Sequence, residues 1–276
     1  DHPDIFKSVD DVRSAFLKFT KNLPLNGILV CCGDDQQIRI LLKDYKGKGI
    51  TYGFSPINDY ILEKARISGT QTFFWAKNKA MGLGEFALRI PGEHNALNAL
   101  GATVVALELG LSIDTIKRAL LEFSGTKRRF EYVGRLKNGI LAYDDYAHHP
   151  TEIQKTLRTF KQSFPKYKIV CVFQPHTYSR TKKLFEQFSR SFNDADIVIL
   201  VNIFPSLREE KDPMVSSQLL VENISRFHKN ALFLPSIFDV IEYVDQNKFD
   251  DKTVIISMGA GDIYKIWKSL FSLRNK

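Results

Sequence analysis

From residue 127 onward the sequence alternates short apolar runs with segments of helical periodicity, and this alternation limits the fold more than any other feature. The apolar runs are GILAYDDYA, KIVCVFQ, DIVILVNIF, ALFLP and TVIISMG. The segments with helical periodicity are 151–163, 181–193, 215–227, 236–247 and 262–272. Apolar strands that alternate with amphipathic helices are typical of an α/β fold with a parallel, doubly wound sheet. Ligands of such sheets bind beyond the carboxyl ends of the strands, so the residues after each apolar run are the first candidates for a site.

The first 125 residues show a different pattern. Apolar residues spaced three and four apart predict a helix over 9–23, and the run GILVCCG predicts a buried strand. Asp34 is expected to cap a helix over 35–45, GITYGFS to form a strand, and residues 59–90 to form hairpins. A long apolar-faced helix follows Pro91-Gly92, and Ser112 is expected to cap another helix that ends near Phe123. A chain of 276 residues is long enough for two domains, which we place at 1–125 and 126–276.

The balance of charge is basic, with 39 Lys and Arg against 31 Asp and Glu. The densest basic groups, Lys127-Arg128-Arg129 and Arg180 to Lys183, lie inside sequence that is expected to be structured, rather than in a tail. A solvated surface or a site for a small anion therefore explains the charge better than nucleic-acid binding does, and we expect no nucleic-acid partner.

Cellular location is inferred from apolar runs and cysteines. No apolar run approaches the ~18–20 residues of a membrane span, and no signal-peptide pattern opens the chain, so we expect no membrane partner. The three cysteines, Cys31, Cys32 and Cys171, have apolar neighbours and no metal-ligand spacing. They are expected to be buried thiols of a reduced, cytoplasmic protein.

The run GILAY is followed by Asp144-Asp145-Tyr146-Ala147-His148-His149-Pro150-Thr151-Glu152. One interpretation is structural: Thr151 and Glu152 begin a helix and the acids are turn residues. That interpretation does not explain two adjacent histidines, which favours a functional loop. A zinc site remains an alternative, although neither a cysteine nor an HExxH spacing supports it.

The run KIVCVFQ is followed by Pro175-His176-Thr177-Tyr178-Ser179-Arg180-Thr181. The guanidinium of Arg180 suits a carboxylate or a phosphate, and His176 supplies a second donor. A helix that begins near Thr181 would add backbone amides and the positive end of its dipole. These features predict an anion-binding site, and the alternative is a surface arginine near a helix start.

Two further segments bear on nucleotides. In PGEHNALN, His94 and Asn98 stand four apart on one face of a helix, and an asparagine amide matches the donors and acceptors of an adenine edge. GAGD, after TVIISM, is interpreted as a tight strand-to-helix turn without a catalytic role. The sequence contains no GxxxxGK(S/T), so a phosphate-binding loop of that type, if the protein uses ATP, lies outside these residues.

Together these motifs resemble the Mur ligases. The residues that carry the resemblance are DHPD, IPGEHNALNA, SGTKRRFE, LAYDDYAHHPTEI, VFQPHTYSRT and MGAGDIY, in the order and spacing of that family. The resemblance covers essentially the whole chain. It implies the later part of a central α/β ATPase domain over 1–125, followed by a Rossmann-like, amino-acid-binding domain over 126–276. It also implies a missing amino-terminal part that binds the UDP sugar and completes the ATP site.

The resemblance is to the branch of the family that joins L-alanine to UDP-N-acetylmuramate during peptidoglycan synthesis. It implies that ATP, with Mg²⁺, phosphorylates the sugar's carboxylate, and that the amine of L-alanine then attacks the acyl phosphate. Residues that match the family's nucleotide and metal positions are His2 for magnesium, His94, Asn95 and Asn98 for the nucleotide, Arg129 for the terminal phosphates and Asp145 for the ribose or for orienting that site.

Four residues match the family's contacts to the amino acid and the muramyl carboxylate: Tyr146, His148, His176 and Arg180. With Arg129, the last three form the expected catalytic set. Position 177 is Thr where many relatives carry a second Arg, so carboxylate binding is expected to depend on Arg180.

Three alternatives stay open. A murein-tripeptide ligase of cell-wall recycling shares most of these motifs, a non-catalytic relic would keep them without activity, and a nucleic-acid binder would use the charge alone. Because the chain has no GxxxxGK(S/T), we expect it by itself neither to hydrolyse ATP nor to ligate.

Overall fold

The computed structural model describes residues 5–24, 26–205, 209–247 and 249–272. The described residues up to Ser124 form one compact unit, and those from Gly125 onward form another. Within these residues, no helix combines the length and the apolar character needed to cross a membrane.

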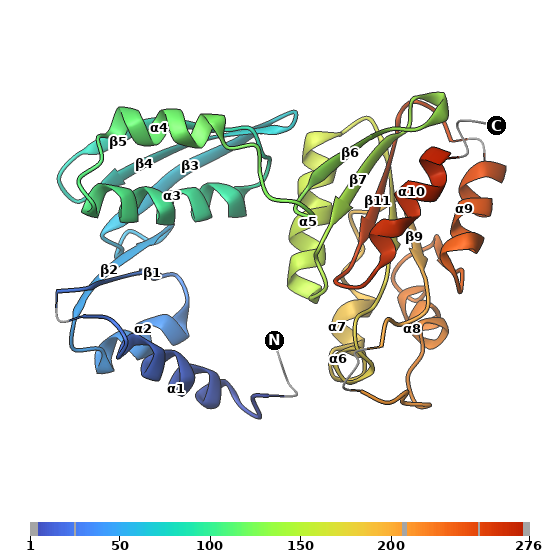
Figure 1. Ribbon diagram of the computed structural model, residues 1–276, viewed down its shortest axis with the longest axis horizontal. Helices are drawn as coiled ribbons and strands as arrows, with labels where there is room; N and C mark the ends of the chain where they lie inside the picture. The colour runs from blue at the N-terminus through green and yellow to red at the C-terminus, as the bar shows by residue number, and fades with distance from the viewer. Residues whose placement is uncertain (1–4, 25, 206–208, 248, 273–276) are drawn as a thin grey trace. The chain divides into compact units, whose positions relative to one another are not determined.

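The first unit is built on a five-stranded sheet with its strands in chain order (Figure 1). Its strands are β1 (Ile28–Cys32), β2 (Lys48–Gly53), β3 (Tyr60–Ser68), β4 (Gln71–Asn78) and β5 (Gly82–Leu88). β1, β2 and β3 pair in parallel, whereas β3, β4 and β5 pair antiparallel. The antiparallel part confirms the hairpins predicted over 59–90.

The helices of this unit are α1 (Val9–Thr20), α2 (Gln36–Asp44), α3 (Glu93–Glu108) and α4 (Ile113–Glu122). Buried side chains of α3 and α4, among them Leu100 and Ile116, pack in one cluster with Phe74 and Phe86 of the sheet. Ser112 caps α4 as predicted.

Asp34 does not cap α2, which corrects the prediction. The side chain of Asp35 accepts the first amides of that helix. The Asp34 carboxylate instead accepts amides of Phe54 and Ser55 at 2.6 and 3.0 Å, and so joins the loops that follow β1 and β2. Two adjacent aspartates cannot be told apart from sequence, because either can supply a cap.

The second unit is built on a six-stranded sheet of order β10-β9-β8-β11-β7-β6. Its strands are β6 (Glu131–Arg135), β7 (Leu141–Asp145), β8 (Lys168–Phe173), β9 (Ile197–Leu200), β10 (Ala231–Phe233) and β11 (Thr253–Met258). All neighbours pair in parallel except β6 and β7. The five predicted strands are confirmed, and the antiparallel edge strand β6 was not predicted.

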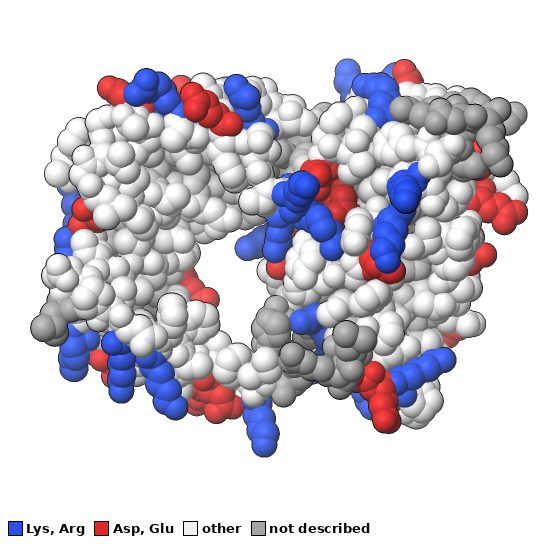
Figure 2. All heavy atoms as spheres, viewed as in Figure 1, with Lys and Arg blue, Asp and Glu red and all other residues white. Residues whose placement is uncertain are grey.

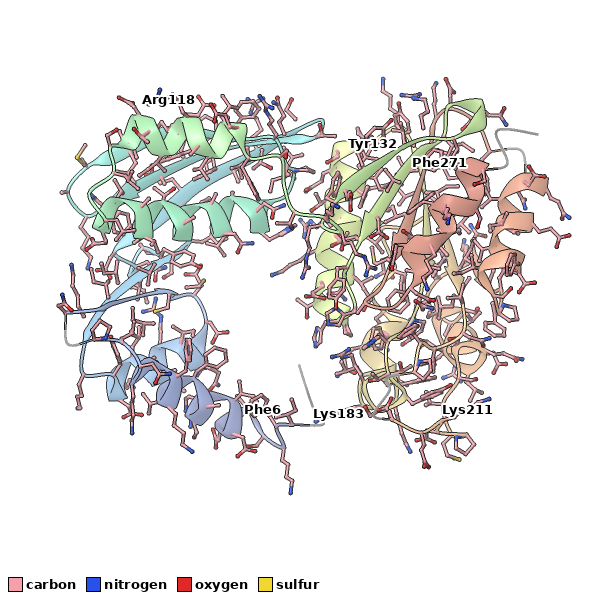
Figure 3. All side chains as sticks on the ribbon, in the orientation of Figure 1. Phe6, Arg118, Tyr132, Lys183, Lys211 and Phe271 are labelled. Atoms are coloured by element: carbon pink, nitrogen blue, oxygen red, sulfur yellow. The ribbon has the colours of Figure 1, made fainter. Side chains whose placement is uncertain are left out.

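β6 escapes a pattern-based prediction because it is short, partly exposed and irregular. Its register shifts between Tyr132 and Gly134, and Gly134 has a φ of +151°. A Cβ atom at Gly134 would lie 2.9 Å from the ring of Phe271 at the end of α10, so a larger residue at this position would require that ring to move. Figure 3 labels Tyr132 on this strand and Phe271 on the helix.

Helices cover both faces of the second sheet (Figure 1). They are α5 (Pro150–Ser163), α6 (Tyr178–Lys183), α7 (Phe185–Ser189), α8 (Ser217–Ile224), α9 (Ile237–Gln246) and α10 (Ile266–Ser272), with short 3₁₀ turns at Lys137–Gly139 and Ile263–Lys265. In β8, Ile169, Cys171 and Phe173 pack in the cluster that contains α5, α7 and α8, whereas Val170 and Val172 pack in the cluster that contains α9 and α10. The doubly wound arrangement is therefore confirmed.

The single helix predicted over 181–193 is wrong. Two short helices, α6 and α7, stand in its place, and the first begins at Tyr178 because Thr177 supplies the cap. Leu184 separates them with a non-helical φ, ψ of −109°, 20°. Of the three cysteines, all free, Cys171 is buried as predicted, whereas Cys31 and Cys32 are only half-buried.

Candidate active site

The loops that follow β7, β11 and β8 lie at one edge of the second sheet, because these three strands are parallel neighbours. Asp145 is the last residue of β7, and Tyr146 and His148 follow it in the loop. His176 lies in the loop after β8, and Arg180 lies in α6. The structure therefore brings these five predicted residues to the carboxyl edge where the fold places ligands.

His148 is buried, and the start of α5 holds it in place. Its Nδ1 lies 3.0 Å from the carbonyl of Tyr146, and its amide donates to Glu152 at 3.0 Å. Burial lowers the pKa of His148, and the positive charges of Arg180 and Arg129 lower it further, against the opposing effect of Glu152. His148 is consequently a neutral imidazole at neutral pH.

His149 has a separate, structural role. It is the N-cap of α5, where its Nδ1 accepts the amide of Thr151 at 3.3 Å, and Glu152 completes a capping box by accepting the amide of His149. The helix therefore begins at Pro150, one residue before the expected start at Thr151, and His149 is its cap. The start of α5 therefore explains His149, and His148 remains the candidate site residue of this pair.

Asp145 is buried, and backbone amides from two segments, the one before β6 and the one after β7, bind its two oxygens. Oδ2 accepts the amide of Phe130 and Oδ1 the amide of Ala147, each at 2.8 Å. Burial raises the pKa of Asp145 to about 6, against the lowering effect of these two amides. These contacts suit the orienting role that was one of its two predicted roles.

Arg180 and His176 form the cationic part of the site. Nη1 of Arg180 lies 3.3 Å from Nδ1 of His176 and 3.3 Å from its carbonyl, and Arg180 is only 6% exposed. The ring of His176 stacks on Phe204 with centroids 5.7 Å apart. Burial and the charge of Arg180 lower the pKa of His176, so a fixed positive charge lies beside a neutral imidazole.

The backbone amides expected at this anion site are occupied by a side chain of the protein. The carboxylate of Glu209 accepts the amides of Tyr178 and Ser179 at 2.6 and 3.1 Å, at the start of α6. The predicted contribution of a helix beginning near Thr181 is therefore wrong. An anion bound at this edge would therefore have to rely on side chains, of which the guanidinium of Arg180 is the predicted donor.

Arg129 and Tyr146 lie next to the loop of His148. The side chain of Arg129 is 52% exposed, with its guanidinium 5.5 Å from the ring centre of Tyr146 and 3.9 Å from Glu152. The ring of Tyr146 meets that of His148 edge-on at 5.2 Å. Arg129 is thus placed to reach a ligand outside the loop.

Sequence reasoning missed the neighbouring residue, Arg128, whose guanidinium binds residues of both β7 and the loop after β11. Its guanidinium binds Asp144 at 2.9 Å and the carbonyls of Gly259 and Gly261 at 2.6 and 3.3 Å. The only signal was its place beside Arg129 in a basic cluster, since its partners are distant in sequence.

The predicted nucleotide residues lie in the first unit, on α3. Nδ2 of Asn95 donates to the carbonyl of Pro91 at 2.7 Å, so this side chain holds the start of the helix. The side chain of Asn98 is exposed one turn further on. His94 precedes them in the same first turn.

His2, the predicted magnesium ligand, lies outside the described residues. Within the residues that are described, no group of three or more His, Cys, Asp or Glu side chains is arranged to hold a metal ion. The zinc alternative therefore gains no support from the loop after β7.

Two family models match the chain. The Mur ligase middle domain matches residues 1–106, and the Mur ligase glutamate ligase domain matches residues 128–261.

Curated relatives point to the same family. The chain is 40% identical to the UDP-N-acetylmuramate–L-alanine ligase of Carboxydothermus hydrogenoformans over 96% of its own length and 56% of the relative. It is 39% identical to the enzyme of the same name from Acetivibrio thermocellus, again over 96% of this chain and 56% of the relative. The chain therefore spans somewhat more than half the length of the curated relatives it matches.

Solved structures agree. The UDP-N-acetylmuramate-alanine ligase of Thermotoga maritima is similar over 100% of this chain and 57% of its own, with a TM-score of 0.79 and 27% identity. A murein peptide ligase of Psychrobacter arcticus shares the fold over 97% of this chain and 55% of its own, with a TM-score of 0.65 and 22% identity.

The two family models and these relatives describe the chain as ligase domains with an α/β fold. The chain belongs to the Mur ligase family, of which it carries the middle domain and the carboxyl-terminal domain.

Proposed function

We propose that the chain is part of an ATP-dependent ligase that joins L-alanine to UDP-N-acetylmuramate in the bacterial cytoplasm. The observation that carries this proposal is the pairing of Arg180 with two neutral histidines, His148 and His176, at one sheet edge. The relatives at 39–40% identity bear the name of this activity.

The site has the chemistry that an amino acid needs. The guanidinium of Arg180 suits the carboxylate of L-alanine, and a neutral imidazole can accept a proton from its ammonium group. The reaction requires the ammonium group to lose one proton first, because only the free amine attacks the carbonyl carbon of an acyl phosphate, and a second proton is lost as the amide forms. Phosphate then leaves and an amide bond remains. We assign the amino acid to Tyr146, His148, His176 and Arg180, in a domain of residues 126–276.

We assign the nucleotide to the domain of residues 1–125, through His94, Asn95 and Asn98. The exposed amide of Asn98 offers both a donor and an acceptor to an adenine edge. Arg129 would neutralise the terminal phosphates, and Asp145 would orient the loop beside it. Mg²⁺ would draw on His2 and on ligands outside the described residues, so we derive no step through the ion.

The test is a phosphate-release assay on the natural protein that carries these 276 residues, with ATP, Mg²⁺ and UDP-N-acetylmuramate. L-Alanine should stimulate release far more than L-Ala-γ-D-Glu-meso-diaminopimelate does. The reverse order would select the tripeptide ligase of cell-wall recycling, and no stimulation by either would leave a non-catalytic relic.

The 276-residue chain by itself is the matched control. It lacks GxxxxGK(S/T), so we expect neither ATP hydrolysis nor ligation from it. Turnover of ATP by this chain alone would mean that a different phosphate site exists within it. A filter assay with DNA and RNA at low salt should detect no binding, because on the face that Figure 2 shows the basic residues are interspersed with acidic and uncharged ones.

A further inference from the structure

Arg128 connects the ends of two neighbouring strands of the second sheet. Its Nε donates to Asp144, next to the last residue of strand β7, at 2.9 Å, and Nη2 donates to the carbonyl of Gly259 after β11 at 2.6 Å. Nη1 reaches the carbonyl of Gly261 at 3.3 Å. Three N–H donors of one planar guanidinium therefore bind three acceptors, one on β7 and two in the loop after β11.

The same guanidinium lies between two aromatic rings. Its centre is 5.0 Å from the ring centre of Tyr146 and 4.7 Å from that of Tyr264. A cation over an aromatic face is attracted by the ring's negative potential, and the attraction grows where water is excluded. The side chain of Arg128 is only 22% exposed, so it fixes the plane against which Tyr146 rests.

The main chain of Arg128 also contacts the loop that carries Tyr146. The carbonyl of Arg128 accepts the amide of Tyr146 at 2.7 Å, and the amide of Arg128 donates to Glu131 at 2.6 Å. Arg128 has a φ of +59°, in the left-handed region that non-glycine residues seldom adopt. Strained backbone of this kind persists where surrounding contacts over-determine it, and it is concentrated at functional sites.

A buried chain of hydrogen bonds holds the partner of Arg128. Ser257 donates to the second oxygen of Asp144, and Nε1 of Trp267 donates to Ser257 Oγ at 2.7 Å. Asp144 is therefore fixed from its far side, and its charge is opposed by Arg128 on the near side. A continuous series of contacts therefore runs from Trp267 through Ser257, Asp144 and Arg128 to the ring of Tyr146.

We propose that Arg128 is a positioning residue for the amino-acid site: it holds Tyr146 and the loop up to His148 in place, and so leaves Arg129 free to face the ligand. This inference rests on the proposed function for what the site binds, but the placement of the loop by Arg128 does not. Lysine could not replace it, since one ammonium group cannot bind Asp144 and both carbonyls along a plane that also stacks on two rings.

Hydrogen exchange of the 276-residue chain tests whether Arg128 holds the loop of Tyr146 and His148 in place, and this measurement does not require enzymatic activity. Arg128→Lys should exchange the amides of residues 144–148 about tenfold faster than the wild-type chain, while the β8 segment 168–173 keeps its rate. Arg158→Lys is the matched control: it makes the same change at an exposed arginine of α5 and should leave the exchange of 144–148 unchanged. Unchanged exchange in Arg128→Lys, or equal acceleration of both segments, overturns the proposal.

Steady-state kinetics of the natural protein that carries the chain then test the link to the site. Arg128→Lys should raise the KM for L-alanine about tenfold and leave the KM for ATP within about twofold, whereas Arg158→Lys should change neither. An unchanged KM for L-alanine contradicts the role of Arg128 in positioning. If the wild-type protein shows no turnover with L-alanine, the proposed function fails, and the exchange experiment still decides the role of Arg128.

Discussion

Nη1 of Arg180 lies 3.3 Å from Nδ1 of His176, and the arginine is the more deeply buried of the two. A charged donor beside an imidazole keeps that imidazole neutral, because a second positive charge at this distance would be repelled. Under the proposed function, Arg180 would bind the carboxylate of L-alanine, and the imidazole of His176 would be available to accept a proton.

Arg180→Ala tests the binding of this carboxylate. A hydrogen bond to a charged group contributes about 1.5–3 kcal/mol, so loss of the guanidinium should raise the KM for L-alanine by roughly 10- to 100-fold. The KM for ATP should change by less than about twofold. Steady-state phosphate release by the natural protein, with L-alanine and ATP varied in turn, measures both.

Arg158→Ala is the control for that variant, because Arg158 is an exposed arginine on α5 and has no predicted role in the site. It removes one positive charge without removing the guanidinium of Arg180. An equal rise in KM for both variants would assign the effect to net charge and remove Arg180 from the site.

Proton acceptance by a neutral imidazole predicts a pH dependence. The pKa values of His148 and His176 are lowered by burial, so both lie below the value of about 6.5 found in unfolded chains. The quantity kcat/KM for L-alanine should fall as pH decreases from about 6.5 through the lowered pKa values of these imidazoles, where they take up protons. Stability contributed by keeping them neutral is present above pH 6.5 and is lost as pH falls. A kcat/KM that is flat from pH 7.5 to 5.5 would contradict a role for a neutral imidazole.

The contribution of Asp145 to folding stability should change with pH in the opposite direction to that of the two histidines. Its pKa is raised from 3.8 to about 6, so its contribution to folding is present below the unfolded value and is lost as pH rises through about 6. Asp145→Asn cannot titrate and should lack this loss. The difference in free energy of unfolding between the two chains, measured with urea at pH 4.5 and pH 7, should be larger at pH 4.5. A difference that does not change with pH would mean that burial does not raise this pKa.

The strand pattern predicted most of the second unit because buried parallel strands need apolar side chains on both faces, as Ile169 to Phe173 show. It could not reveal β6, because the glycine that this strand needs at position 134 is explained by contact with Phe271, some 137 residues later in the chain. For the same reason the sequence could not predict that Glu209 occupies the start of α6, or that Arg128 reaches Gly259. The position of each loop at a strand end can be predicted from the sequence. The residues that its side chains contact cannot, because they depend on which strands become neighbours in the sheet.

Glu209 supplies a further test. Its carboxylate caps Tyr178 and Ser179, and loss of a cap costs about 0.5–2 kcal/mol. Glu209→Ala should lower the free energy of unfolding by that amount and speed exchange of amides in α6. Glu210→Ala, an exposed neighbour, should do neither. Equal stability of the two variants in urea would show that the contact adds nothing to folding.

Substitutions of the two asparagines of α3, Asn95 and Asn98, should have different effects, one on folding stability and the other on ATP binding. Nδ2 of Asn95 donates to the carbonyl of Pro91, so Asn95→Ala should cost about 0.5–1.5 kcal/mol of stability, the typical net value of one hydrogen bond. Asn98 is exposed, so Asn98→Ala should leave the free energy of unfolding within about 0.5 kcal/mol. In the natural protein, Asn98→Ala should nevertheless weaken ATP binding about tenfold, measured by titration calorimetry. Wild-type affinity for ATP in Asn98→Ala would remove this residue from the nucleotide site, whatever Asn95→Ala does to stability.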